Sequence, residues 1–287
     1  MPQSAVYNPH MQEPVCFIGG MIVPLQEARV GVYDLGLLRA FGIYEGITAI
    51  KGEPFHFHDH FARFERSAKA LGLTLPFTED EALHATREIV KKNAGEARAT
   101  VRMILTGGAA ESGIVHVPGR ETFYILAEVA EQFSKKIYEE GGSLITTEHQ
   151  RALPEYKTID YITAVMLQPQ RKAAGAVDML YVSKSEVLEC GGSNIFIVKG
   201  SELITPSEGV LHGITRKVVL DLAGNSYPVH ERHVTLDELL GADEVFMTGS
   251  FKDIVPIVKI GDAQISTGTI GPITRDLMAQ FKKYAGL

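Results

Sequence analysis

The stretch RALPEYKTIDYITAVMLQPQRKAAGA, residues 151–176, places one lysine, Lys157, between polar, turn-forming residues and an expected helix. A positive charge near a helix start opposes the helix dipole, so this is a poor position for a purely stabilising lysine. If Lys157 points inward, burial lowers the pKa of its amine, and the neutral amine can attack a carbonyl carbon. The alternative is an ordinary solvated lysine, which is the more common case. The stretch therefore raises the hypothesis of a lysine that forms a Schiff base.

Composition restricts the class of protein. The chain has 287 residues, of which 45% are hydrophobic and 22% charged, the balance of a globular protein of enzyme size. A net charge of −7 without a basic run argues against nucleic-acid binding. Cys16 and Cys190 lie far apart and indicate a reducing compartment. Because neither a signal-peptide pattern nor a membrane-length apolar stretch is visible, we expect a cytoplasmic protein without a membrane partner.

The order of expected elements predicts an α+β protein with two domains. VCFIGGMIV and ITAIKGEPFHF read as hairpins, and FHDHFARFERSAKALG reads as an amphipathic helix that ends at Gly72. Thr78 and Glu81 form a capping-box pattern at the start of a second helix. Two strands around a glycine-rich loop at 107–119 follow. We expect a small domain at 1–129, a linker at 130–136 and a larger domain of strands and helices at 137–287.

Two turns in the second half are suited to binding a phosphate group. In LHGITRKVVLDLA, Gly213, Ile214 and Thr215 begin a helix, where unpaired backbone N–H groups and the positive dipole end attract anions. In FMTGSFKDI, residues 248–250 follow a strand and supply hydroxyl and N–H groups. Each turn alone is also explained as an ordinary cap or turn. Two in one domain favour a phosphate ligand.

Glu189, in EVLECGGSNIFIV, ends an expected strand before a Gly-Gly turn. A solvated turn carboxylate is the simplest interpretation, but a buried Glu189 needs a cationic partner, which a protonated pyridine nitrogen would provide. The histidines His56, His58 and His60 are spaced by two at a helix start, so they cannot share one face, and we expect no metal site there.

Two arginines of the first half, Arg39 and Arg102, are embedded in apolar sequence. A buried arginine needs an anionic partner, and structural ion pairs are the usual explanation. The guanidinium group also binds a carboxylate through two parallel hydrogen bonds. Arg39 and Arg102 are therefore candidate ligands for the carboxylate of a substrate.

Five segments together are similar to the fold-type IV aminotransferases, the pyridoxal-phosphate-dependent family of branched-chain and D-amino-acid transaminases and aminodeoxychorismate lyase. The segments are FARFERSA, LPEYKTIDY, EVLECGGSNIF, GITRK and FMTGSFKDI, in the family's order. The resemblance runs from about residue 19 to the end of the chain. It implies a small α/β domain, a larger domain with a barrel-like core of strands, and a homodimer.

The resemblance also implies roles for individual residues around pyridoxal 5′-phosphate. Lys157 would form the Schiff base and then move the proton between the substrate Cα and the cofactor C4′. Tyr161 would hydrogen-bond the phenolate oxygen, and Glu189 would keep the pyridine nitrogen protonated. The phosphate would be bound by Arg63, Ile214, Thr215 and Ser250, and Leu211 would pack on the ring. The implied reaction transfers an amino group from an amino acid to a 2-oxo acid in two half-reactions.

The substrate side of the resemblance leaves alternatives open. The sequence lacks the RPxH pattern of one group of D-amino-acid transaminases, and Thr100 stands where branched-chain enzymes have a tyrosine. LLRAFGIYEG and VRMILTGG are similar to a less typical D-amino-acid group, in which two arginines hold the substrate carboxylate, and Arg39 and Arg102 match that pair. We expect D-amino acids, with L-branched-chain amino acids as the second candidate and aminodeoxychorismate lyase as the third. A binding module without catalysis would lack Lys157 or Glu189, and both are present.

Overall fold

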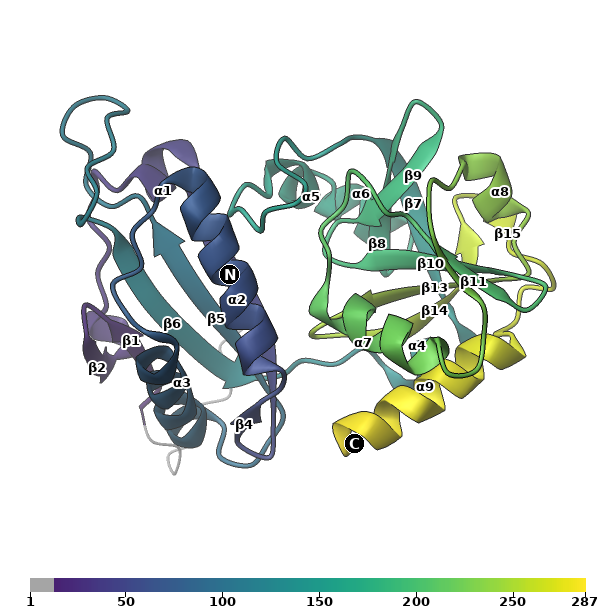
Figure 1. Cartoon of the computed structure of the whole chain (residues 1–287), viewed down its shortest axis with the longest axis horizontal. Helices are drawn as coiled ribbons and strands as arrows, with labels where there is room; N and C mark the ends of the chain where they lie inside the picture. Colours follow the sequence, from purple (N-terminus) through teal and green to yellow (C-terminus); the bar gives the residue numbers. More distant parts are fainter. Residues whose placement is uncertain (1–12) are drawn as a thin grey trace. The chain divides into compact units, whose positions relative to one another are not determined.

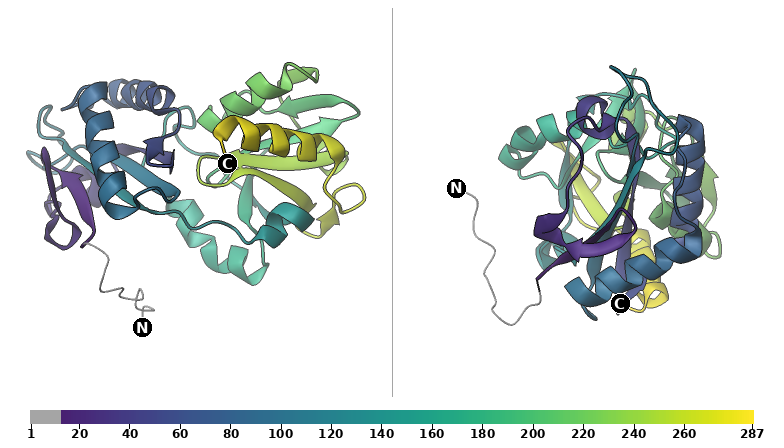
Figure 2. Two further views of the ribbon diagram at one scale, coloured as in Figure 1. Left: turned by 90° about the horizontal axis from the view of Figure 1, so that it is seen from below. Right: turned by 90° about the vertical axis from the view of Figure 1, so that its left-hand side faces the viewer.

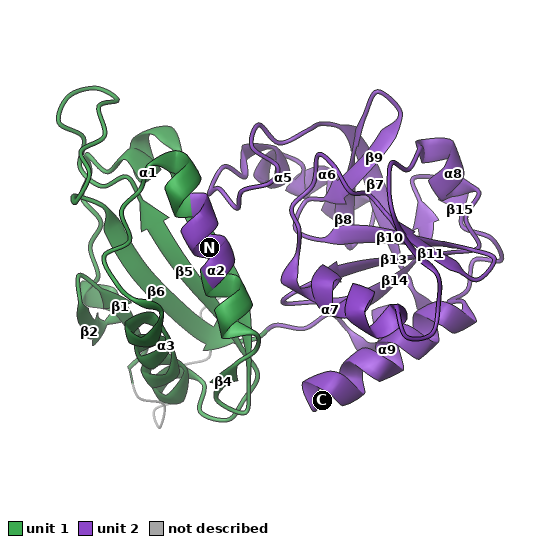
Figure 3. Cartoon of the chain, viewed as in Figure 1, with its two compact units in different colours: residues 1–61, 68–130 green, residues 62–67, 131–287 purple. Residues whose placement is uncertain are grey.

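The computed structural model describes residues 13–287, so most of the segment inspected for a signal peptide lies outside the described residues. The described chain forms two compact units (Figure 3). Unit 1 holds the chain through Phe61 and residues Ala68–Ala130, and unit 2 holds Ala62–Ser67 and Glu131–Leu287. Helix α4, Lys135–Glu140, begins inside the segment expected to be a linker. The domain boundaries at 129 and 137 stay a prediction.

Unit 1 is built on a six-stranded antiparallel sheet (Figure 1). Its strands, in spatial order, are β2 (Met21–Pro24), β1 (Val15–Ile18), β6 (Thr122–Val129), β5 (Ala99–Thr106), β3 (Gly42–Ile50) and β4 (Glu53–Pro54). The helical elements are η1 (Leu25–Glu27), α1 (Leu35–Arg39), α2 (Phe57–Leu71), which includes the six residues assigned to unit 2, and α3 (Glu79–Asn93). Helix α3 packs on β6 and β1.

Local sequence signals explain the elements of unit 1. Gly19 and Gly20 both have positive φ and join β1 to β2, as the Gly-Gly hairpin pattern predicts. Helix α2 buries the apolar side chains expected from its spacing and ends at Gly72, which takes the left-handed conformation. At the start of α3 the Thr78 hydroxyl accepts from the backbone of Glu81 while the Glu81 side chain accepts from Thr78, which confirms the capping box.

Unit 2 contains a nine-stranded mixed sheet. Its main path is β12 (Val229–Glu231), β11 (Glu202–Thr205), β10 (Asn194–Lys199), β13 (Glu244–Gly249), β14 (Asp253–Ile260), β7 (Gly142–Glu148), β8 (Asp178–Ser183) and β9 (Glu186–Cys190), with β15 (Ala263–Gln264) beside β14. Strand β9 ends this path, yet only the turn 191–193 separates it from β10 near the other end. The sheet must therefore curl, which gives the barrel-like core expected from the resemblance.

The remaining helices of unit 2 lie around this curled sheet (Figure 2). They are α5 (Ile162–Met166), α6 (Gln168–Ala173), α7 (Ile214–Ala223), α8 (Leu236–Leu240) and α9 (Pro272–Ala285). Helices α7 and α9 pack on each other and on β13. Inside, every residue from Asn194 to Val198 is buried, and the rings of Phe196 and Phe246 stack at 4.9 Å. No helix within residues 13–287 is long and apolar enough to cross a membrane.

The helix expected directly after Lys157 begins later and is broken. Helix α5 starts only at Ile162, and α6 follows it with a proline, Pro169, in its first turn. Proline has no N–H to donate, so it fits in the first turn of a helix, where that N–H would have no partner within the helix. Lys157 therefore lies in a loop, and the argument that a helix dipole opposes its charge is wrong.

Candidate active site

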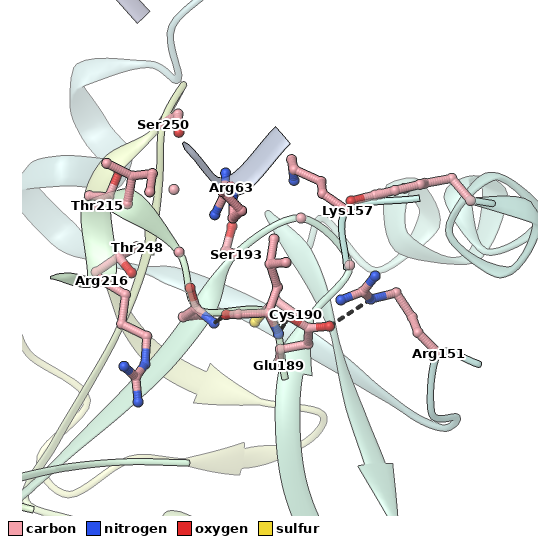
Figure 4. A pocket seen from close by; sticks show the side chains of 18 residues that line it. Arg63, Arg151, Lys157, Glu189, Cys190, Ser193, Thr215, Arg216, Thr248 and Ser250 are labelled. Atoms are coloured by element: carbon pink, nitrogen blue, oxygen red, sulfur yellow. Dashed lines mark hydrogen bonds and ion pairs between the residues drawn. The ribbon is translucent and has the colours of Figure 1, made fainter. Parts of the chain in front are cut away.

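Unit 2 contains a pocket where the ends of several elements meet (Figure 4). The space between its lining atoms is about 450 Å³, including the solvent at its open mouth. Its walls come from α2, the loop between β7 and α5, the β9–β10 turn, the start of α7 and the β13–β14 turn. Thr215 and Ser250 lie on one side of Figure 4, and Glu189 with Arg151 on the other.

The pocket brings together a lysine and a buried carboxylate. Lys157 is half-buried, and its backbone N–H donates to the Ser67 hydroxyl at 3.4 Å. Glu189 is 5% exposed, so the simpler interpretation of a solvated turn carboxylate is wrong, and a buried carboxylate needs a cationic partner. The cation in this chain is Arg151, whose Nε donates to the Glu189 carboxylate at 2.7 Å. The other carboxylate oxygen accepts from the Leu211 N–H at 3.0 Å.

The start of α7 lies at one end of the pocket and is suited to binding an anion. Its cap residue Gly213 provides no side-chain hydrogen bond, so the first N–H groups of the helix are left for a ligand. A Cβ on Gly213 would lie 2.2 Å from Oδ1 of Asn194, so only glycine fits there without a shift. Asn194 in turn donates to the Leu211 carbonyl at 2.6 Å. This contact connects the helix start to the backbone that holds Glu189.

Two further side chains complete this end of the pocket. Arg63 is 3% exposed, and its Nη1 donates to the His212 carbonyl at 2.9 Å, one residue before the cap of α7. The Thr248 hydroxyl is buried and has no hydrogen-bond partner among the described residues. A buried hydroxyl without a partner is costly, and a bound polar group would satisfy it.

A thiol also lines the pocket but is poorly suited to nucleophilic attack. Burial raises the pKa of the Cys190 thiol well above its usual range, and the nearby negative charge of Asp178 raises it further. A thiol that stays protonated is a weak nucleophile. Cys190 is therefore a poor candidate for the nucleophile of this pocket.

The structure places eight sequence-predicted residues around this one pocket. They are Arg63, Lys157, Tyr161, Glu189, Leu211, Ile214, Thr215 and Ser250. The two candidate carboxylate ligands, Arg39 and Arg102, belong to unit 1 and are not among the lining residues. Their expected burial is wrong: Arg39 is exposed, and the Arg102 side chain is 39% exposed and pairs with Glu128. A long arginine side chain carries its charge to the surface even from an apolar strand.

Sequence reasoning missed Arg151 and Asn194. Arg151 lies 38 residues from its partner Glu189, and Asn194 lies 17 residues from Leu211, so no helical or strand period connects them. Thr248 had a local signal, because a Thr-Gly-Ser turn after a strand was already expected to bind a phosphate. Among residues 13–287, no group of three or more His, Cys, Asp or Glu side chains is placed to hold a metal ion.

The fold with this curled sheet matches that of solved branched-chain aminotransferases. Residues 42–260 match the family model for class IV amino-transferases. The chain belongs to this family.

Relatives with two different substrates resemble the chain over nearly its whole length. It is 33% identical to a putative branched-chain-amino-acid aminotransferase of Methanocaldococcus jannaschii, over 93% of this chain and 94% of the relative. It is 29% identical to a D-alanine aminotransferase of Staphylococcus aureus, over 93% of this chain and 96% of the relative.

Solved structures give the same family. The T.th. branched-chain amino acid aminotransferase with pyridoxamine 5′-phosphate superposes with a TM-score of 0.87 at 27% identity, covering 96% of this chain and 95% of that one. The branched-chain aminotransferase of Thermoproteus uzoniensis with norvaline gives a TM-score of 0.86 at 28% identity, covering 95% and 94%.

Proposed function

We propose that this class IV aminotransferase uses pyridoxal 5′-phosphate to move an amino group between an amino acid, with D-amino acids favoured, and a 2-oxo acid. The observation that carries the proposal is the meeting of Lys157, the buried Glu189 and an anion-binding helix start in one pocket. Class IV aminotransferases use this cofactor, and one similar structure contains its amine form.

The residues of the pocket fit a phosphorylated ring. The buried hydroxyl of Thr248 has no hydrogen-bond partner among the described residues, and the glycine at 213 leaves a recess that a Cβ would fill. Arg63, Ser250 and the N–H groups of Ile214 and Thr215 would hold the phosphate, because a guanidinium group and a helix start both favour an anion. Leu211, which is 8% exposed, would pack on the ring.

The chain's own groups would supply binding and proton movement. When bound, pyridoxal phosphate supplies an aldehyde and a ring that withdraws electrons from the substrate Cα. Lys157 would hold the aldehyde covalently and, once released, carry a proton to and from Cα. Glu189 would hold a proton on the ring nitrogen, and the Tyr161 hydroxyl would donate to the ring oxygen. Each role uses a residue that lines the pocket.

Two substrate classes remain in competition. The resemblance of LLRAFGIYEG and VRMILTGG, and the D-alanine aminotransferase relative, support D-amino acids. The putative branched-chain relative and the branched-chain structures support L-leucine, L-isoleucine or L-valine equally well. Aminodeoxychorismate lyase activity stays a third candidate, carried only by the sequence resemblance.

The half-reaction with single amino acids tests the proposal. The purified protein, incubated with pyridoxal phosphate, is mixed in turn with the D and L forms of alanine, glutamate and leucine, and conversion of bound cofactor to its amine form is followed spectroscopically. We expect conversion with at least one amino acid and faster conversion with D-alanine or D-glutamate. Conversion only by L-leucine would replace the D-amino-acid proposal with the branched-chain one, and no conversion by any amino acid would contradict transamination of these substrates.

We also propose that the protein is a cytoplasmic homodimer. Helix α5 exposes three large apolar side chains, Ile162, Val165 and Met166, at 62%, 67% and 73%. An exposed apolar group of this kind is typical of a surface covered by a partner. Light scattering after size-exclusion chromatography should give twice the mass of one chain, and a monomer at micromolar concentration would contradict the dimer.

A further inference from the structure

Arg151 connects Glu189 to the loop that carries Lys157, although no sequence motif includes Arg151. Its side chain is 10% exposed, and the residue follows β7 in the loop that leads to Lys157. The Nε atom donates to Glu189 Oε1 at 2.7 Å, and Nη1 donates to the Tyr156 carbonyl at 3.0 Å. Nη2 donates to the Pro154 carbonyl. All three nitrogens of one guanidinium group therefore have partners.

These three contacts hold two separate segments of the chain. One is the end of β9, where Glu189 lies. The other is the loop that carries Lys157, because the contacted carbonyl of Tyr156 belongs to the residue just before it. The guanidinium group is rigid and planar, so it fixes the direction from the carboxylate to the loop as well as the distance. Lysine would keep the charge, but its small ammonium head cannot reproduce the planar arrangement of donors on three nitrogens.

The carboxylate is held from its other side as well. Glu189 Oε2 accepts from the Leu211 N–H at 3.0 Å, and the Leu211 carbonyl accepts from Asn194 at 2.6 Å. Glu189 is thus fixed to the backbone next to the anion-binding helix start, and Arg151 extends that network to the lysine loop. Removing Arg151 would leave a buried carboxylate without a cation and the loop without two of its hydrogen bonds.

We propose that Arg151 is a positioning residue that sets the placement of Lys157 relative to Glu189. This inference rests on the proposed function for its catalytic consequence, but the contacts themselves belong to the chain without cofactor. Arg151 does not take part in proton transfer. It acts through the two residues that do, so its replacement should lower kcat more than it raises KM.

Two variants separate the geometry of Arg151 from its charge. Arg151→Lys keeps a cation beside Glu189 and loses carbonyl contacts, whereas Arg151→Gln loses the cation. A matched control is Arg171→Lys, because Arg171 makes the same kinds of contact, from Nε to the Gln168 side chain at 2.8 Å and from Nη1 to the Ala176 carbonyl at 2.7 Å, outside the pocket lining.

The first measurement is hydrogen exchange of the cofactor-free protein in the peptide covering residues 152–160. Loss of one or two hydrogen bonds to the loop should make exchange about 5- to 10-fold faster in Arg151→Lys and leave it unchanged in Arg171→Lys. The second is the pH midpoint of the visible spectrum of bound cofactor. Arg151→Gln removes a positive charge, so protonation of the bound cofactor becomes easier. The pH midpoint of its spectrum should therefore rise by about one pH unit.

The third measurement is kinetic, and we expect kcat to fall about tenfold or more in Arg151→Lys with KM changed less than threefold. Unchanged exchange, midpoint and kcat in both Arg151 variants would overturn the inference. So would a variant that simply melts below the assay temperature, since the role would then be general stability. A wild-type protein that binds no pyridoxal phosphate would refute the proposed function instead, while the exchange comparison would still decide whether Arg151 holds the loop.

Discussion

Replacement of Gly213 by alanine should weaken cofactor binding for a purely steric reason. Gly213 has φ −67° and ψ 146°, which alanine adopts without strain, so no backbone penalty is expected. The added Cβ would lie 2.2 Å from Asn194 Oδ1, and the amide must move by about 1.2 Å to reach the 3.4 Å of ordinary contact. Either Asn194 or the start of α7 has to give way.

The magnitude follows from what that movement breaks. Asn194 is 6% exposed, and its Nδ2 donates to the Leu211 carbonyl at 2.6 Å, so a displaced amide leaves a buried acceptor unsatisfied. Such a loss costs about 1–3 kcal/mol. If the helix start moves instead, its N–H groups no longer point at the phosphate, at a similar cost. Because each 1.4 kcal/mol is tenfold, we expect the Kd for pyridoxal phosphate to rise about 5- to 150-fold.

A double-mutant cycle with Asn194→Ala makes the reasoning refutable. Equilibrium dialysis of the cofactor against wild type, Gly213→Ala, Asn194→Ala and the double variant gives the coupling between the two positions. Removing the amide removes the clash, so alanine at 213 should cost much less in the Asn194→Ala background. Gly31→Ala serves as the control, because a Cβ there meets nothing within 4 Å. An unchanged Kd in Gly213→Ala, or an equal loss in both backgrounds, would show that the contact does not shape the pocket.

Three other perturbations test separate parts of the structure. Borohydride reduction with bound pyridoxal phosphate, followed by peptide mapping, should label Lys157. A label on another lysine would contradict the assignment of Lys157 as the residue that binds the cofactor. Glu189→Gln should slow the half-reaction about 100- to 1000-fold while cofactor still binds. An unchanged single-turnover rate would show that the carboxylate has only a structural role. Burial acts to raise the pKa of Glu121, but hydrogen bonds from Thr74, Gly119 and His116 outweigh it and lower that pKa. A lowered carboxyl pKa stabilises the fold above the unfolded value of about 4.3, so the thermal-stability gap between wild type and Glu121→Gln should shrink as pH falls below it, and a gap that persists in acid would refute the role of the charge.

The parts of the fold that the sequence predicts are those fixed by nearby residues. The Gly19–Gly20 hairpin, the stripe of buried side chains on α2 and the capping box at Thr78 each depend on residues within a few positions of one another. The same is true of the turns at Thr215 and Ser250, which both line the pocket and which we predict bind an anion. A local pattern is sufficient wherever the hydrogen bonds that define an element are local.

The features that the sequence does not predict depend on distant contacts or on competing local preferences. The pair of Arg151 and Glu189 forms only because the β7–α5 loop and the end of β9 meet in the folded unit. Apolar neighbours suggested a buried Arg102, but strand pairing places Glu128 within reach of its guanidinium group, and the side chain extends to solvent. The single helix expected after Lys157 is divided because Pro169 begins a second one.

The residues proposed for the chemistry and those predicted to choose the substrate belong to different units. Every residue proposed to hold the cofactor belongs to unit 2, whereas the candidate carboxylate ligands Arg39 and Arg102 belong to unit 1. Which enantiomer reacts depends on where its carboxylate is anchored, since Cα–H must face Lys157. On the prediction that these two arginines anchor that carboxylate, Arg39→Leu and Arg102→Leu should each lower kcat/KM for D-alanine about 10- to 100-fold, the value of a charged hydrogen bond, with the cofactor Kd unchanged.

Variants of unit 2 should lower the turnover of all amino acids without changing the preference for one enantiomer. Gly213→Ala and Glu189→Gln act on steps common to all amino acids, so they should lower turnover of D and L substrates in the same proportion. The ratio of the two kcat/KM values, measured for both sets of variants, separates anchoring from chemistry. An altered ratio in Glu189→Gln, or an unaltered one in both arginine variants, would mean that the hand of the substrate is chosen by unit 2 and that the arginine clamp is wrong.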